Sequence, residues 1–201
     1  MTAPALVGLD AAGTPEAWAA AGFTVVDGVV TIGHVAVRVG VGEKGLAAWT
    51  FTGIPAIADV DGLPTRVTDD APRERVEHPN GAQLIDHLVV WSPDDARTIE
   101  AFTDLGLEVK RVREDARPGF RQTFLRAGEV IVELVAADRP PAAGPARFFG
   151  VACTVADLAA CADLLGDRLG EVKPAVQPGR SIATLRGRDI GLEVAIAFMS
   201  E

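Results

Sequence analysis

Two stretches of this chain repeat the same pattern of residues, and this repeat restricts the fold more than any other feature of the sequence. Residues 86–95 (DHLVVWSPDD) align with residues 148–157 (FFGVACTVAD). Both begin with aliphatic and aromatic residues typical of a β-strand and continue into small polar and acidic residues typical of a helix start. Residues 129–135 align in the same way with residues 189–195, each as a closing strand. The chain is therefore predicted to contain one supersecondary unit twice.

Each copy contains the elements of a βαβββ unit. After the first strand, the spacing of apolar residues predicts an amphipathic helix, which ends at Gly106 in the first copy and at Gly170 in the second. Two further strand-like segments and the closing strand follow each helix. The copies span residues 85–136 and 147–198, and a proline-rich linker, residues 137–146, separates them.

Residues 1–53 are predicted to form an incomplete third copy. A strand-like segment is followed by Thr14, which has the side chain of a helix N-cap and precedes a proline. Asp27 and Gly28 then fit a two-residue hairpin turn, because both residues tolerate the positive φ angles that such a turn requires. Residues 54–80 hold four of the 13 prolines and many charges, so we predict an irregular connector there.

These elements predict an α+β fold with tandem βαβββ modules in residues 81–198. The helices are expected to cover the aliphatic face of the sheet, because this burial removes apolar surface from water. An odd number of modules leaves one sheet without a partner. The incomplete N-terminal module is therefore expected either to pack against the pair or to associate with its counterpart in a homodimer.

Strand alternation selects which side chains share a face of the sheet. In the first copy, His87, Val89 and Trp91 point to one side of their strand. On the closing strand, Glu133 points away from the aliphatic side chains that suit the helix. The sequence therefore predicts His87 and Glu133 on the sheet face opposite the helix.

The second copy gives a corresponding set. Glu193 lies between aliphatic residues on the predicted closing strand and is expected to face away from the helix. On the first strand of that copy, the residues predicted to share the face are Phe149, Val151 and Cys153. The two copies are thus expected to present glutamates to the same side of the sheet.

The double βαβββ repeat, with His87 on a first strand and Glu133 and Glu193 on the two last strands, resembles the vicinal oxygen chelate superfamily. This superfamily includes glyoxalase I, extradiol dioxygenases and bleomycin-resistance proteins, and the resemblance covers about residues 82–198. It implies that the modules pair into one curled mixed sheet, a cup with the helices outside. It also implies that the first and last strands of each module supply ligands to a divalent metal in the cup, where the metal acts as a Lewis acid.

Position by position, the resemblance implies His87 and Glu133 as ligands from one module and Phe149 and Glu193 from the other. Phe149 cannot ligate a metal, but one imidazole and two carboxylates still suit nickel, zinc, manganese or iron. With such a metal the protein would be a glyoxalase-like lyase, isomerase or dioxygenase acting on a small organic molecule with a carbonyl group. Glu133 or Glu193 would then move protons as the catalytic base.

The resemblance leaves a second function open. A cup that lost its metal would keep a polar floor and could bind or sequester a small organic molecule, as bleomycin-resistance proteins do. Trp91 and Phe149 would form its walls, although Trp91 equally fits a packing residue at the rim. A slip of one residue in the alignment would turn the predicted ligand set to the other face of the sheet.

Basic residues are concentrated near the end of the first module. Six Lys and Arg residues lie between residues 110 and 126, against two acidic ones. Arg121 and Arg126 lie on a predicted strand and are the candidates to bind an anionic group of a substrate at the rim of the cup. The other interpretation is a solvated loop and an edge strand whose charge resists aggregation.

Composition and motifs exclude several functional classes. The net charge of −9 has the sign opposite to that of most nucleic-acid-binding domains. No apolar run approaches the roughly 18 residues of a membrane helix, and the first residues lack the basic start of a signal peptide, so a cytoplasmic protein is expected. Cys153 and Cys161 are predicted to be reduced and buried. The sequence contains no nucleotide-binding or serine-hydrolase motif.

Overall fold

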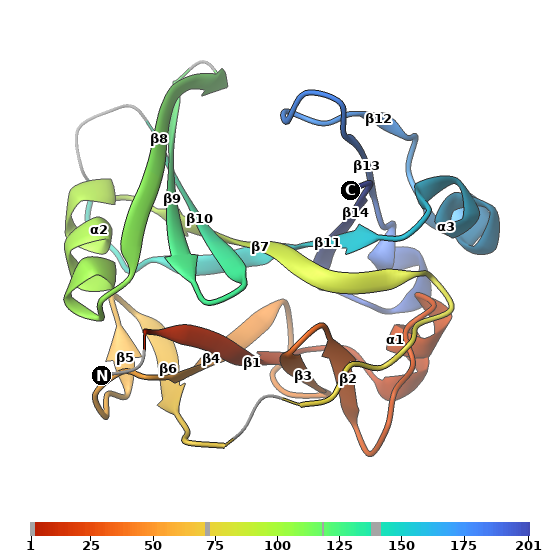
Figure 1. The fold of residues 1–201 in the computed structure, drawn as a ribbon, viewed down its shortest axis with the longest axis horizontal. Helices are drawn as coiled ribbons and strands as arrows, with labels where there is room; N and C mark the ends of the chain where they lie inside the picture. The colour runs from red at the N-terminus through yellow and green to blue at the C-terminus, as the bar shows by residue number, and fades with distance from the viewer. Residues whose placement is uncertain (1–2, 71–72, 118, 138–141) are drawn as a thin grey trace.

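The structure is a computed structural model that describes residues 3–70, 73–117, 119–137 and 142–201. In these ranges it contains a six-stranded and an eight-stranded β-sheet and three α-helices. The six-stranded sheet lies beneath the centre of the eight-stranded sheet in Figure 1. The predicted α+β fold class is confirmed. None of the helices in these ranges is long and apolar enough to cross a membrane.

The eight-stranded sheet is built from two βαβββ modules. The first consists of β7 (Ala82–Ser92), α2 (Asp95–Asp104), β8 (Glu108–Arg117), β9 (Phe120–Ala127) and β10 (Val130–Ala137). The second consists of β11 (Arg147–Val155), α3 (Leu158–Leu165), the short 3-10 helix η1 (Gly166–Arg168), β12 (Lys173–Pro174), β13 (Ser181–Thr184), the 3-10 helix η2 (Gly187–Ile190) and β14 (Ala195–Met199). The strand order is β12-β13-β14-β11-β7-β10-β9-β8.

Each module pairs its last strand in parallel with its first, and the two first strands, β7 and β11, pair antiparallel at the centre of the sheet. From this centre the outer strands of both modules rise to the same side, so the sheet curls, with α2 and α3 on its outside (Figure 1). This arrangement is the curled mixed sheet that the family resemblance implies. The concave side of this sheet is its inner face.

Local sequence signals explain where the elements begin. Thr14 caps α1 (Pro15–Ala20), because its hydroxyl accepts a hydrogen bond from the amide of Ala17 at 3.3 Å. Asp157 caps α3 in the same way, accepting from Ala159 at 2.8 Å. Asp27 and Gly28 have φ angles of 50° and 73°, as the predicted hairpin turn requires.

The N-terminal sheet repeats the arrangement of the eight-stranded sheet in shortened form. It contains β1 (Ala5–Ala11), α1 (Pro15–Ala20), β2 (Val29–Ile32), β3 (Val35–Val39), β4 (Leu46–Thr52), β5 (Asp59–Val60) and β6 (Leu63–Val67). The strands β1 and β4 pair antiparallel at the centre, and each pairs in parallel with the last strand of its own half, β3 or β6. The strands β5 and β6 thus lie in residues 54–80, where an irregular connector was predicted. The N-terminal region therefore has two shortened halves in place of one incomplete module.

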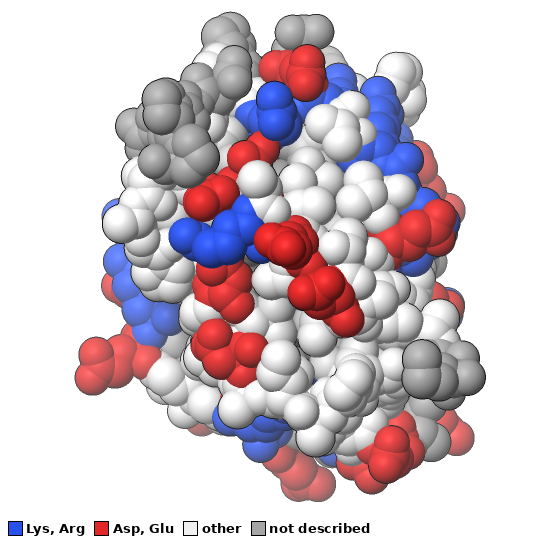
Figure 2. All heavy atoms as spheres, turned by 90° about the vertical axis from the view of Figure 1, so that its left-hand side faces the viewer, with Lys and Arg blue, Asp and Glu red and all other residues white. Residues whose placement is uncertain are grey.

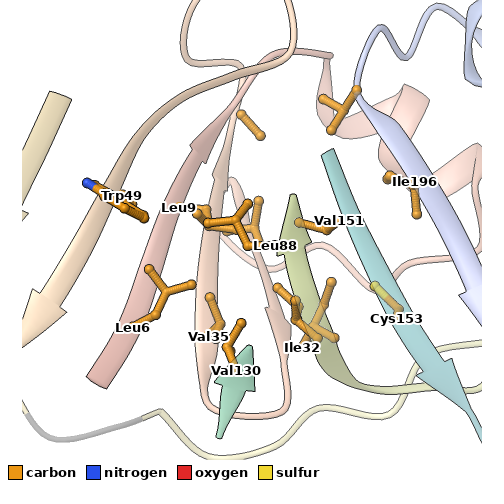
Figure 3. Packing of buried hydrophobic residues seen from close by; sticks show 14 of the residues in the cluster. Leu6, Leu9, Ile32, Val35, Trp49, Leu88, Val130, Val151, Cys153 and Ile196 are labelled. Atoms are coloured by element: carbon orange, nitrogen blue, oxygen red, sulfur yellow. The ribbon is translucent and has the colours of Figure 1, made fainter. Parts of the chain in front are cut away.

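The main hydrophobic core lies between the two sheets. Figure 3 shows Leu9 of the N-terminal sheet next to Leu88 of the eight-stranded sheet, and Leu6, Trp49 and Val151 belong to the same buried cluster. All five side chains are buried. Burial of this apolar surface stabilises the stacked arrangement at roughly 25 cal/mol for each Å² removed from water. The N-terminal sheet thus packs against the paired modules within one chain. This was one of the two arrangements expected from the sequence, the other being a homodimer.

A β-bulge in β11 changes the register of the second module. Phe148 pairs with Val90 and Gly150 pairs with Val89, so Phe149 has no partner on β7. Gly150 is required there, because a Cβ atom at this position would lie 2.2 Å from the backbone oxygen of Ala195. The bulge leaves the side chain of Phe149 65% exposed.

Candidate functional site

Two of the predicted ligand residues meet on the inner face of the sheet. The parallel pairing of β7 and β10 places His87 opposite Ile131 and Val89 opposite Glu133. All of these side chains point to the inner face, because alternate residues of a strand share a side and paired residues share a face. The Nε2 atom of His87 lies 3.3 Å from Oε2 of Glu133. The first module therefore forms an imidazole–carboxylate pair.

A second carboxylate, Asp86, holds the other side of the imidazole. The pairing of β7 with β11 skips Asp86, and this irregularity lets neighbouring residues turn their side chains to the same side. Oδ2 of Asp86 lies 2.8 Å from Nδ1 of His87. Arg180 donates to Oδ1 of Asp86 at 2.8 Å and to the backbone oxygen of Ser200 at 2.8 Å. Neither Asp86 nor Arg180 is among the site residues predicted from the sequence.

The two carboxyl groups that flank His87 differ in acidity. The hydrogen bond from His87 is the main cause that holds the pKa of Asp86 below its ordinary value. Glu133 is only 8% exposed, and burial raises the pKa of its carboxyl group, against the opposing effects of His87 and Gln122. The carboxylate form of Asp86 is therefore favoured, and it lies against Nδ1 of His87 while Nε2 of the same ring faces Glu133. Glu133 holds a proton to a higher pH than an exposed glutamate does.

Gln122 completes the surroundings of Glu133. Its side-chain amide donates a short hydrogen bond to Oε1 of Glu133 and leaves Oε2 facing His87. The amide oxygen of Gln122 is buried and has no hydrogen-bond partner among the residues that the structure describes. A buried acceptor without a partner costs stability, so this atom suits a donor group of a bound molecule.

Basic residues line the inner face next to this cluster. Arg126 pairs with Ile131, and Arg113 pairs with Gln122, so both point to the inner face. Arg113 is near enough to Glu133 to act against the rise in the pKa of that carboxyl group. The pairing of β9 with β10 places Arg126 on this face, as predicted. Arg113 was not among the predicted anion-binding residues.

Arg121 points to the outer side of the sheet. It is one residue out of phase with Gln122, and its guanidinium forms an ion pair with Asp95 of α2 at 3.1 Å. It also lies 3.5 Å from Glu114. Figure 2 shows basic and acidic side chains interspersed on the side of the molecule where α2 lies. Arg121 therefore belongs to a surface ion-pair group and does not meet His87 and Glu133.

The second module has no counterpart of the imidazole–carboxylate pair. The partner of His87 on β10 is Ile131, and Glu133 lies two residues after Ile131 on the same strand. In the second module, Gly150 and Ala152 of β11 share the inner face with Val89 and His87, and they pair with Ala195 and Ala197 of β14. None of these four glycine and alanine residues carries a ligand atom. At these positions the second half of the inner face carries no large or polar side chain, and this half is called smooth for that reason.

Phe149 and Glu193 lie away from the inner-face cluster, contrary to expectation. Glu193 precedes β14, and its carboxylate lies 3.9 Å from the ammonium group of Lys44 in the N-terminal region. Both residues line a separate cavity of about 880 Å³. Val151 and Cys153, expected beside Phe149 on the inner face, are buried in the core between the sheets (Figure 3).

The donor set does not fit the metal centre that the resemblance implies. His87 and Glu133 come together, but the paired inner-face positions of β11 and β14 hold Gly150 with Ala195 and Ala152 with Ala197, which offer no ligand. Within the described ranges, no group of three His, Cys, Asp or Glu residues is arranged to hold a metal ion. A metal held from both modules, as in the predicted set with Glu193, therefore has too few protein donors.

Trp91 lies on the inner face, two strand positions beyond Val89, as predicted. The guanidinium carbon of Arg147 lies 4.3 Å from the centre of its ring. This cation–π contact fits the interpretation of Trp91 as a packing residue at the rim. It orders the end of the inner face near the start of β11.

The solved structures similar to this chain include methylmalonyl-CoA epimerase from Mycobacterium tuberculosis, which is 20% identical with a TM-score of 0.49 over 60% of this chain and 89% of that chain. A variant of methylmalonyl-CoA epimerase from Streptomyces coelicolor, in complex with 2-nitronate-propionyl-CoA, is 22% identical with a TM-score of 0.46 over 58% and 96%. A hypothetical protein from Bacillus halodurans C-125 is 18% identical with a TM-score of 0.46 over 58% and 93%. The chain matches no curated protein.

A family model described as the Glyoxalase/Bleomycin resistance protein/Dioxygenase superfamily matches residues 86–184. The match begins at Asp86, includes the His87 and Glu133 pair, and ends at the last residue of β13. It therefore spans both βαβββ modules up to the turn before β14, and the resemblance seen in the sequence is confirmed. The paired modules of this chain belong to the glyoxalase, bleomycin resistance protein and dioxygenase superfamily.

Proposed function

We propose that the inner face of the eight-stranded sheet binds a small anionic molecule with a carbonyl group, and that Glu133 takes a proton from the carbon next to that carbonyl. The observation that carries the proposal is the buried carboxyl group of Glu133, 3.3 Å from the imidazole of His87. A carboxyl group whose pKa is raised by burial accepts a proton more strongly than an exposed one. Perturbed carboxyl groups of this kind are concentrated at functional sites.

The cluster of Asp86, His87 and Glu133 can take a proton from a substrate carbon and return it. The C–H bond of the substrate breaks, its electron pair moves onto the carbonyl oxygen to give an enolate, and the proton forms an O–H bond on Glu133. Return of the proton to either face of the carbon regenerates the carbonyl. His87 shares protons with Oε2 of Glu133 through Nε2, while Asp86 holds Nδ1 in place. No step requires a ligand from the second module.

Charge on the inner face favours an anionic substrate. Arg113 and Arg126 face the side where Glu133 lies, and the chain is otherwise strongly acidic. Guanidinium groups bind carboxylates and phosphates with two parallel hydrogen bonds. The smooth half of the inner face, with Gly150 and Ala197, leaves room for the remainder of the molecule.

The proposal is tested by proton exchange in D₂O, with 2-oxobutyrate as the probe. Loss of its C3 proton signal in ¹H NMR measures abstraction next to the carbonyl, and neutral 2-butanone tests the need for the anion. Glu133→Gln should lower the exchange rate at least about 100-fold, because general base catalysis contributes roughly this much. The matched control Glu129→Gln changes an exposed carboxylate in the β9–β10 turn and should exchange as the natural protein does.

The exchange experiment also separates catalysis from binding alone. A Glu133→Gln protein that exchanges at the rate of the natural chain would contradict the role of Glu133.

The smooth half of the inner face also favours a second candidate, a protein that binds its ligand without turnover. That candidate predicts binding of 2-oxobutyrate in calorimetry with exchange no faster than in buffer.

The arginines provide a separate test of where the anion binds. Arg113→Ala should weaken binding of 2-oxobutyrate by about tenfold, because a charge-assisted hydrogen bond contributes roughly 1.5 kcal/mol or more. Arg121→Ala removes an arginine of the same strand pair that points to the outer side, and it should leave binding unchanged. Equal effects of the two substitutions in calorimetry would show that the anion does not bind on the inner face.

A further inference from the structure

The cavity of about 880 Å³ lies where the N-terminal sheet meets the second module. Three segments line it: residues 44–46 before and at the start of β4, residues 147–149 at the start of β11, and the stretch from Thr184 to Ala195. The amide of Gly45 donates to the backbone oxygen of Glu193 at 3.2 Å, which joins the two regions. The volume lies in the range of small-molecule binding pockets.

Phe149 gives this cavity an aromatic wall. It is the most exposed of the large hydrophobic side chains in the described part of the chain. The bulge in β11 turns it out of the strand pairing, whereas its neighbour Phe148 packs its ring 5.4 Å from Trp49. An exposed phenyl ring in a cavity offers a face for another flat ring, whose stacking recovers the apolar burial that the bulge gives up.

The side chains that line the cavity also carry a net positive charge. Its four basic side chains, Lys44, Arg147, Arg186 and Arg188, outnumber the acidic Asp189 and Glu193. Among the residues that the structure describes, neither Arg188 nor Arg147, whose guanidinium lies over the ring of Trp91, forms an ion pair. In a chain with a net charge of −9, this local reversal of sign attracts anions.

We infer that this cavity is a second binding site, for a small molecule that carries a planar aromatic ring and an anionic group. The ring stacks on Phe149, and the carboxylate or phosphate oxygens of the ligand bind Arg188 and its basic neighbours. The site is distinct from the cluster of Asp86, His87 and Glu133, none of which lines the cavity. It depends on the N-terminal sheet, which supplies Lys44 and closes one side.

Titration with 2-naphthoate tests the site directly. In ¹H–¹⁵N NMR spectra, the amide signals that shift should be those of residues 44–46, 147–150 and 184–195. Calorimetry should show 2-naphthoate binding at least about tenfold more tightly than neutral 2-naphthamide and non-planar cyclohexanecarboxylate, because each lacks one of the two contacts. Equal affinities for the three compounds, or shifts confined to residues 86–91 and 131–135, would overturn the inference.

Substitutions separate this site from the inner face. Phe149→Ala and Arg188→Ala should each weaken 2-naphthoate binding about three- to tenfold, since both side chains are exposed and their loss leaves the core intact. The matched controls Val176→Ala and Arg75→Ala change an exposed apolar and an exposed basic side chain outside the cavity, and should leave the affinity unchanged. Loss of binding in the controls would overturn the inference.

The same variants distinguish this inference from the proposed function. Phe149→Ala should leave the exchange of 2-oxobutyrate as it is in the natural protein. If the natural protein exchanges no 2-oxobutyrate at all, the 2-naphthoate titration still decides the second site. Shifts of residues 147–150 that appear on concentrating the protein without ligand would assign the cavity to contact with another copy of the chain, and would overturn the inference.

Discussion

Trp49 joins the two sheets and offers a quantitative test of their packing. Its side chain is fully buried, with ring centres of Phe51, Phe102 and Phe148 at 4.9 to 5.4 Å. Its indole nitrogen donates to the hydroxyl of Thr65 at 2.6 Å. These contacts link the N-terminal sheet to α2 and to β11. If the two sheets share one core, removal of this ring must lower the stability of the whole chain.

Trp49→Ala should lower the free energy of unfolding by about 3 to 5 kcal/mol, the range for a buried aromatic truncated to alanine. Trp49→Phe keeps most of the ring contacts and loses the hydrogen bond to Thr65, so a smaller loss of about 1 to 2 kcal/mol is expected. Trp91→Ala is the matched control, because that ring is half-buried at the rim, and about 1 kcal/mol or less is expected.

Urea unfolding followed by circular dichroism measures all three variants, with one slope fitted to each transition. A loss below about 1 kcal/mol in Trp49→Ala would refute the shared core, because it lies outside the range for a well-packed buried ring. Two separate transitions in the natural protein would refute it as well, since they would show that the sheets unfold independently.

Two further predictions concern titratable groups. Burial raises the pKa of Cys153 to about 12 and that of Cys161 to about 11, so a thiol reagent at pH 8 should modify neither in the folded protein and both in denaturant. Asp86 has a folded-state pKa below its ordinary 3.8, so its stabilising effect is complete above that value and is lost as the pH falls through the folded-state pKa. Asp86→Asn should therefore lose stability at neutral pH and little at the acid limit, and parallel acid-unfolding curves for the two proteins would contradict this.

The fold was predictable because the duplicated segments carry strong local signals. Alternating apolar residues mark the central strands, and the same alternation placed His87 and Glu133 on one face, where the structure has them. In the second module the closing strand was predicted at residues 189–195, but the strand in the structure is β14, Ala195–Met199. Leu192 and Val194 alternate with polar residues as a strand would, but they are buried in the loop after η2.

The remaining features of the site depend on irregular strand pairing, which the alternation of apolar and polar residues in the sequence does not reveal. The bulge at Phe149 and the skipped pairing at Asp86 each shift a strand by one residue, and such shifts reverse the side to which the following side chains point. Arg180 reaches Asp86 from 94 positions away in the sequence. The neighbouring positions of Asp86 and His87 were the one local signal that could have suggested this contact.

The close contact at Gly150 makes the difference between the halves hard to reverse. A histidine at this position would add a ring to the inner face of the second module, yet its Cβ atom would collide with the backbone of β14. A side chain therefore cannot be added at Gly150 without displacing β14. The imidazole–carboxylate pair of the inner face thus lies on the side of the first module, next to a second module whose backbone strands approach each other too closely for a ring at this position.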